Sequence, residues 1–191
     1  VRVQPRQHRI VRADVRGEPK PPPIADPVAP SPTVAPEKLL SAPVRELLID
    51  RIGVSAPIVS LNVTPAGAMD VPKGPRDVGW YDFTGKPGLG GNAVFSGHVD
   101  YVNYGAAVFW DLKKLQPGDT IDVRLSDGTV IHYAVTGSHL YESDDIPMGE
   151  VLAQTSFGSI TLITCGGTFA SGEYSHRLVV RGVQTGVTLA G

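Results

Sequence analysis

Prolines are distributed unevenly along the chain, and their distribution limits where a packed domain can form. Residues 1–43 contain ten of the seventeen prolines, and their apolar residues follow no sustained period. Because proline lacks an amide hydrogen and fixes its own φ angle, this density favours extended polyproline II backbone over a packed core. We therefore interpret residues 1–43 as a spacer and residues 44–191 as the folded domain.

Composition and charge exclude several classes of protein. Hydrophobic residues make up 41% and charged residues 19% of the chain, a balance typical of a globular domain. The net charge of −2 gives no general attraction to nucleic acid, and no apolar run is long enough to span a membrane. A single cysteine excludes an intrachain disulfide framework and a multi-cysteine zinc site. The chain begins at Val1, so we expect an upstream segment that has been removed.

Short segments rich in β-branched and aromatic residues, separated by glycine and proline, recur through residues 44–191. This pattern predicts an antiparallel barrel or sandwich with little helix. The expected strands are residues 46–52, 56–61, 92–98, 121–125, 130–138, 159–165 and 177–184, and the expected helical turns are residues 109–115 and 147–153.

The strand at residues 159–165 ends on the only cysteine, Cys165, and we expect the two glycines at 166–167 to end it at once. A thiol at the tip of a rigid strand is held firmly and stays reachable, as a nucleophile requires. The alternative is a cysteine that packs as a small hydrophobic core residue.

A nucleophilic thiol needs a base and a donor for the oxyanion, and two residues have suitable positions. His98 ends a predicted strand directly after a glycine, and Arg177 begins the last strand after a loop of eleven residues. If the strands of Cys165 and Arg177 are neighbours, the loop returns Arg177 to the sulfur. His176 is the competing base, but next to Arg177 on a strand it should face the opposite side.

Three motifs together resemble the sortases, the bacterial cysteine transpeptidases of the cell envelope. Thr-Leu-Ile-Thr-Cys at residues 161–165 resembles the signature around the nucleophile, and Asn-Ala-Val-Phe-Ser-Gly-His-Val-Asp at 92–100 resembles the strand that delivers the histidine. Tyr-Ser-His-Arg-Leu-Val-Val-Arg at 174–181 resembles the strand that delivers the arginine. The match covers residues 45–186, and its details are most similar to the actinobacterial classes E and F.

The resemblance implies a mostly β fold, a closed sortase-type barrel of about eight strands with short helices. It implies Cys165 as nucleophile, His98 as acid and base, Arg177 as oxyanion stabiliser, and Thr164 as a residue that positions substrate. The implied activity is cleavage of an LPXTG-like sorting signal between Thr and Gly through a thioester, followed by transfer to a cell-wall amine. The implied partners are surface proteins that carry sorting signals and a peptidoglycan precursor.

The same resemblance implies a monomer on the outer face of a Gram-positive cell membrane, attached through the missing N-terminal anchor. No cofactor or metal is required, although calcium bound by Glu142, Asp144, Asp145 and Glu150 stays open because some sortases bind calcium. Two other functions also stay open: a cell-wall L,D-transpeptidase-like cysteine enzyme, and a non-catalytic β-barrel surface module.

Overall fold

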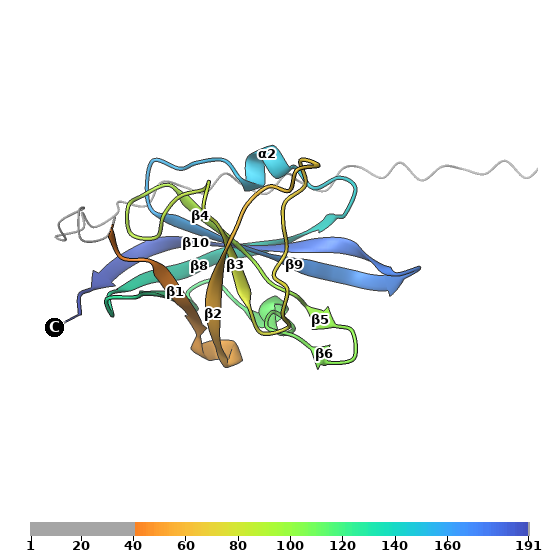
Figure 1. Cartoon of the computed structure of the whole chain (residues 1–191), viewed down its shortest axis with the longest axis horizontal. Helices are drawn as coiled ribbons and strands as arrows, with labels where there is room; N and C mark the ends of the chain where they lie inside the picture. Colours follow the sequence, from red (N-terminus) through yellow and green to blue (C-terminus); the bar gives the residue numbers. More distant parts are fainter. Residues whose placement is uncertain (1–40, 191) are drawn as a thin grey trace, which may run out of the picture.

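The computed structural model describes residues 41–190, and these form a closed eight-stranded barrel (Figure 1). The strand order around the barrel is β1-β2-β3-β4-β9-β10-β8-β7. Its strands are β1 (Val44–Ile49), β2 (Val54–Leu61), β3 (Val78–Tyr81), β4 (Asn92–Ser96), β7 (Thr120–Leu125), β8 (Val130–Glu142), β9 (Ser159–Ala170) and β10 (Glu173–Thr188). The predicted mostly β barrel is therefore confirmed.

The remaining elements are short and are not strands of the barrel. They are the 3₁₀ turns η1 (Asp50–Ile52) and η2 (Leu112–Lys114), the two-stranded sheet of β5 (Asp100–Tyr101) and β6 (Gly105–Ala106), and the helix α2 (Met148–Val151). The segments predicted as helical, residues 109–115 and 147–153, each contain one short turn, η2 and α2. No helix within residues 41–190 is long and apolar enough to cross a membrane.

Alternation along the strands produces two separate hydrophobic clusters. Ile160 and Leu162 of β9 pack inside the barrel, whereas Ile163 packs on its outer face. The outer cluster joins Ile163 to Val94 of β4, Val179 of β10 and Val151 of α2, so α2 covers this part of the sheet (Figure 1). Successive side chains on a strand point to opposite faces, and burial of both faces explains why residues 159–164 of β9 are all buried.

The domain boundary lies slightly before the expected residue. Ala42, which the sequence assigned to the spacer, is buried in the barrel core, and the amide of Ser126 donates to the carbonyl of Pro43. Residues 42 and 43 therefore pack with the folded domain. The rest of the proposed spacer, residues 1–40, lies outside the described residues.

The prediction of an eleven-residue loop between Cys165 and Arg177 is wrong. Instead β9 continues to Ala170, β10 begins at Glu173, and the two strands form a long hairpin that extends past the barrel (Figure 1). Ser171 and Gly172 both have positive φ angles, 54° and 90°, which suit a two-residue turn. Gly167 also has a positive φ, 74°, at a shift in the pairing register. This glycine therefore forms a bulge within the strand and does not end it.

Candidate active site

The barrel pairs Cys165 of β9 with Arg177 of β10, and His98 lies two residues beyond the end of the neighbouring strand β4. On the other side of β9, Ser96 of β4 pairs in parallel with Ile163, and the amide of Gly97 donates to the carbonyl of Ile163 at 3.2 Å. Extending this register by two residues would bring His98 level with Cys165, in one row with Arg177. Alternation puts the side chains of Cys165 and Arg177 on the face that carries Ile163.

Cys165 is half-buried, and its environment keeps the thiol protonated at neutral pH. Burial raises the pKa of Cys165 above its usual 9.0, and the carboxylate of Asp100 raises it further. The positive charge of Arg177 opposes this by lowering the pKa, but the burial effect is the larger one. A thiol is a weak nucleophile in its neutral form, so attack requires a group that accepts its proton.

His98 is held by a backbone carbonyl on the segment between β2 and β3. Its Nε2 lies 2.7 Å from the carbonyl oxygen of Pro72. A carbonyl oxygen only accepts, so Nε2 carries the hydrogen and Nδ1 is the nitrogen that can exchange a proton. The rings of Tyr101 and His98 pack in a T-shaped arrangement with 5.1 Å between their centroids, and the Tyr101 hydroxyl donates to the Lys73 carbonyl. These contacts fix the tautomer and the orientation of His98.

The guanidinium of Arg177 is anchored at one end. Its Nη1 donates to Ser143 Oγ at 2.9 Å and to the carbonyls of His176 at 3.0 Å and Tyr174 at 3.3 Å. Ser143 Oγ in turn donates to the Tyr174 carbonyl. Within residues 41–190, every hydrogen bond found for this guanidinium starts at Nη1. Nε and Nη2 therefore keep donors for an oxygen of a bound substrate.

Thr164 and His176 alternate with the row and face the other side of the sheet. Thr164 is buried, and its Oγ1 donates to the Gly97 carbonyl at 2.8 Å, which ties β9 to the residue before His98. His176 pairs with Gly166, and its Nδ1 lies 2.7 Å from Ser175 Oγ. The geometry therefore separates His176 from the side chain of Cys165.

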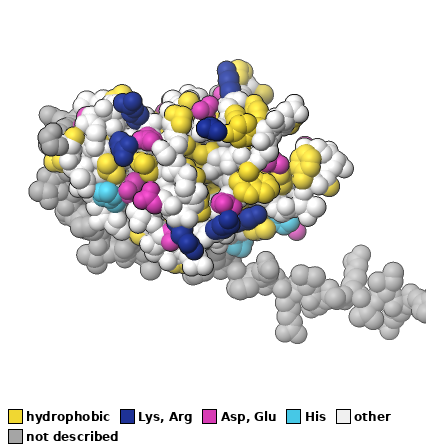
Figure 2. Space-filling view, turned by 90° about the horizontal axis from the view of Figure 1, so that it is seen from below, with side chains coloured by type: hydrophobic (Ala, Val, Ile, Leu, Met, Phe, Trp, Pro, Cys, Tyr) yellow, Lys and Arg dark blue, Asp and Glu magenta, His cyan; other side chains and the backbone are white. Residues whose placement is uncertain are grey.

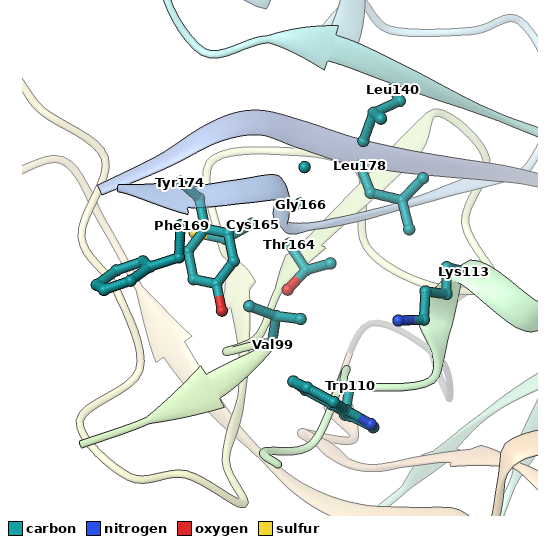
Figure 3. Close-up of a pocket in the computed structure, with 11 residues that line it drawn as sticks. Val99, Trp110, Lys113, Leu140, Thr164, Cys165, Gly166, Phe169, Tyr174 and Leu178 are labelled. Atoms are coloured by element: carbon teal, nitrogen blue, oxygen red, sulfur yellow. The ribbon is translucent and has the colours of Figure 1, made fainter. Parts of the chain in front are cut away.

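A cavity of about 400 Å³ opens beside Cys165 (Figure 3). Phe169 and Tyr174 of the β9–β10 hairpin line one side, and Trp110 and Lys113 line another. Cys165 belongs both to the row and to the lining of this cavity, whereas His98 and Arg177 are not among the residues that line it. Its full lining is Val99, Trp110, Lys113, Leu140, Thr164, Cys165, Gly166, Gly167, Phe169, Tyr174 and Leu178.

Comparison with protein-family models decides which family has this arrangement. The Sortase domain model matches residues 47–185, nearly the whole of the described barrel. The chain belongs to the sortase family. Sortases are cysteine transpeptidases, which excludes the L,D-transpeptidase-like enzyme and disfavours a surface module without catalytic activity. A search of curated protein sequences finds no match.

Solved sortases share this barrel. The SrtA sortase from Actinomyces oris is 27% identical with a TM-score of 0.59, covering 76% of this chain and 81% of its own. Sortase C-1 from the same organism is 26% identical with a TM-score of 0.58, covering 81% of this chain and 84% of its own. The lid mutant of sortase A from Corynebacterium diphtheriae is 25% identical with a TM-score of 0.57, covering 76% of this chain and 72% of its own. Placement in class E or F stays a prediction.

A contact that the sequence did not indicate crosses the site of this sortase. The hydroxyl of Tyr174 donates to Asp100 Oδ2 at 2.6 Å, which links the β9–β10 hairpin to β5. This hydrogen bond is the main cause that raises the pKa of Tyr174 to about 12. The two residues are 74 positions apart, and neither carries a local pattern that would have predicted the pair.

The residues considered for calcium do not form a metal site in the described part of the chain. Within residues 41–190, no group of three or more histidine, cysteine, aspartate or glutamate side chains is placed to hold a metal ion. Glu142, Asp144, Asp145 and Glu150 therefore do not gather around one point. The calcium hypothesis finds no support in this geometry.

Proposed function

We propose that this sortase cleaves an LPXTG-like sorting signal between Thr and Gly and transfers the acyl fragment to a cell-wall amine. The observation that supports the proposal best is the row of His98, Cys165 and Arg177, in which Cys165 pairs with Arg177 and His98 follows the strand on the other side of β9. The row supplies the three chemical groups that acyl transfer by a thiol requires: a nucleophile, an acid and base, and an oxyanion donor.

In the first half-reaction, Cys165 Sγ attacks the carbonyl carbon of the substrate threonine. Nδ1 of His98 is the nitrogen free to take the thiol proton, because Nε2 is bonded to Pro72. The carbonyl oxygen gains negative charge, and Nε and Nη2 of Arg177 donate to it. The Thr–Gly C–N bond then breaks, and His98 returns the proton to the leaving amine. The product is a thioester on Cys165.

In the second half-reaction, an acceptor amine attacks the thioester carbonyl carbon. The new amide C–N bond forms, the C–S bond breaks, and His98 takes the proton that the amine loses. Arg177 stabilises the same oxygen a second time. Water can replace the amine and gives slow hydrolysis of the sorting signal.

Intact mass spectrometry of the protein incubated with an LPXTG peptide tests the activity. We expect an adduct equal to the peptide mass minus the fragment released from glycine onwards, formed on wild-type protein and absent from Cys165→Ala. A cysteine that packs only as a core residue would give no adduct, and would also fail to react with a thiol reagent in native protein. Absence of an adduct with a peptide library varied around the motif would refute the proposal.

The proposed location is the outer face of the cell membrane of a Gram-positive bacterium, where sorting-signal proteins and peptidoglycan precursors meet. Family membership supports sorting-signal proteins as the substrate class. Cell fractionation with an antibody against the barrel tests the location. Recovery of the protein in the cytoplasmic fraction would contradict it.

A further inference from the structure

Residues 167–175, here called the arm, form the part of the β9–β10 hairpin that extends past the barrel (Figure 1). Pairing of β4 with β9 ends at Ile163, and pairing of β8 with β10 ends at His176. Within residues 41–190, the strand segments beyond these points pair only with each other. The position of the arm relative to the barrel therefore depends on a small number of individual contacts.

Two residues outside the hairpin hold the arm by hydrogen bonds found within residues 41–190. One is Ser143, whose amide donates to the Ser175 carbonyl at 2.9 Å and whose Oγ donates to the Tyr174 carbonyl at 2.7 Å. The other is Asp100 of β5, whose Oδ2 accepts from the Tyr174 hydroxyl at 2.6 Å. Tyr174 therefore joins the segment that follows β8 to the strand that follows β4.

The carbonyl of Tyr174 is also an anchor of Arg177. It accepts from Nη1 at 3.3 Å, and Ser143 Oγ, which donates to the same carbonyl, lies 2.9 Å from Nη1. The third acceptor of Nη1 is the carbonyl of His176. A shift of Tyr174 would therefore disturb two of the three groups that hold the guanidinium.

Strand β5 provides a fixed base for the arm, because it is tied to the segment between β2 and β3. Tyr101, the residue after Asp100, donates to the Lys73 carbonyl at 2.7 Å. The Tyr101 ring also packs against His98, whose Nε2 contacts the Pro72 carbonyl. The base that holds His98 thus also carries the carboxylate that holds the arm.

Packing between aromatic rings does not replace this hydrogen bond. The rings of Phe169 and Tyr174 lie 5.0 Å apart between centroids, but both residues belong to the arm and move with it. Phe169 is 59% exposed, and Figure 2 shows other hydrophobic side chains exposed among charged ones on the face seen from below. In Figure 3 the Tyr174 hydroxyl points away from the hairpin. The bond to Asp100 is therefore the contact that fixes the Tyr174 side chain to β5.

We propose that Tyr174 is a positioning residue for Arg177. Its hydroxyl bonds the arm to β5, and its carbonyl then holds Nη1 so that Nε and Nη2 face the oxygen that gains charge beside Cys165. Tyr174 acts through the guanidinium and not on the reacting atoms. The inference rests on the proposed transpeptidase function, because it concerns the stabilisation of the oxyanion during that reaction.

Four variants test the bond between Tyr174 and Asp100. Tyr174→Phe removes the hydroxyl and keeps the ring, and Asp100→Ala removes the acceptor, so either variant breaks the bond if the other fails to fold. Asp100→Asn keeps an oxygen that can accept the same bond. The matched control is Tyr104→Phe, which also removes a tyrosine hydroxyl, one that accepts from Arg76 and has no contact with the arm. Formation of the acyl-enzyme is followed by mass spectrometry at increasing concentrations of LPXTG peptide.

We expect Tyr174→Phe and Asp100→Ala each to lower the maximal rate of acyl-enzyme formation about five- to tenfold, close to the lower limit for a hydrogen bond to a charged group. The half-saturating peptide concentration should change less than about twofold, because Arg177 acts mainly on the transition state. Asp100→Asn and Tyr104→Phe should stay near wild type. A weaker half-saturation at an unchanged maximal rate, or an equal loss in Asp100→Asn and Asp100→Ala, would overturn the proposal.

The Arg177→Ala background tests whether Tyr174 acts through the guanidinium. Adding Tyr174→Phe to this background should cause no further loss in the maximal rate, because the group that Tyr174 positions is absent. A general structural role predicts the same loss in both backgrounds. That result would refute the positioning role.

The side-chain Nε–H signal of Arg177 in NMR spectra gives a readout that does not depend on activity. The signal should shift in Tyr174→Phe and in Asp100→Ala, and it should not shift in Tyr104→Phe. Shifts in a protein whose wild type forms no acyl-enzyme would retain the positioning role of Tyr174 and refute the transpeptidase function. An acyl-enzyme that forms at the wild-type rate in Tyr174→Phe, with no shift of the signal, would refute the positioning role alone.

Discussion

Replacing Arg177 by alanine tests whether this residue acts on the reaction or holds the last strand in place. Loss of one preorganised oxyanion donor costs about 2.7–4 kcal/mol, which corresponds to a hundred- to a thousand-fold loss in turnover. We expect a loss of this size, because Nε and Nη2 of Arg177 remain available to a substrate oxygen.

The structure also gives Arg177 a stabilising role whose size can be compared with this loss. The hydrogen bonds from Nη1 of Arg177 to Ser143 Oγ and to two backbone carbonyls are partly exposed. When the guanidinium is removed, water can donate to these acceptors in its place. We assign them together about 1–2 kcal/mol, which lowers the melting temperature by roughly 2–8 °C. Domains are stable by about 5–15 kcal/mol, so more than about 95% of the variant stays folded at 25 °C. Unfolding therefore cannot account for a hundred-fold loss of turnover.

The assay measures peptide cleavage and thermal unfolding of Arg177→Ala, Arg177→Lys and Ser143→Ala. Arg177→Lys keeps the charge but not the fork of donors, so it should recover only part of the turnover. Ser143→Ala removes one anchor and leaves the guanidinium in place, so its turnover should stay within a few-fold of wild type. Normal turnover in folded Arg177→Ala, together with a large fall in melting temperature, would refute the catalytic assignment.

Three further predictions follow from the site and the domain boundary. His98→Ala should reduce peptide cleavage by about a hundred-fold or more, whereas His176→Ala should retain it, and the reverse pattern would reject His98 as the acid and base. Iodoacetamide alkylates the thiolate form of Cys165, so the rate of alkylation should rise with pH with a midpoint above pH 9.0. The midpoint should lie at a still higher pH in Arg177→Ala, because the positive charge that lowers the pKa is lost. A midpoint below pH 9.0 would contradict the argument that burial raises the pKa of Cys165. Deletion of residues 1–40 should preserve a cooperative thermal transition, and its loss would show that this segment is needed for folding.

The placement of Arg177 beside Cys165 could be predicted because it depends on strand periodicity. A β-branched run ending on Cys165 indicated a strand, and alternation indicated that Arg177 and His176 face opposite sides. The pairing of Cys165 with Arg177 then followed once their strands were neighbours. The position of His98 relative to Cys165 could not be derived in this way, because it depends on the parallel pairing of β4 with β9, two segments far apart in the sequence.

The β9–β10 hairpin was not predicted because a glycine in a strand pattern can mark either the end of the strand or a bulge within it. Gly166 and Gly167 suggested an end to β9, but Gly167 forms a bulge and pairing continues on both sides of it. The actual turn is at Ser171 and Gly172, where a serine adopts a positive φ that few residues other than glycine favour. Local composition did not distinguish the bulge from the turn, since each contains a glycine beside a small or polar residue.

The two adjacent lysines of η2 show why the lining of the cavity beside Cys165 could not be predicted from sequence. Lys113 and Lys114 are chemically identical, and a charged pair near a short helical turn is normally a solvated surface feature. Successive residues of a 3₁₀ turn point about 120° apart, so the two side chains must face different surroundings. Lys114 meets Asp111, and Lys113 meets Trp110 and the cavity beside Cys165. That difference depends on where the η2 turn lies relative to the cavity beside Cys165, which is set by the tertiary fold and not by the local sequence.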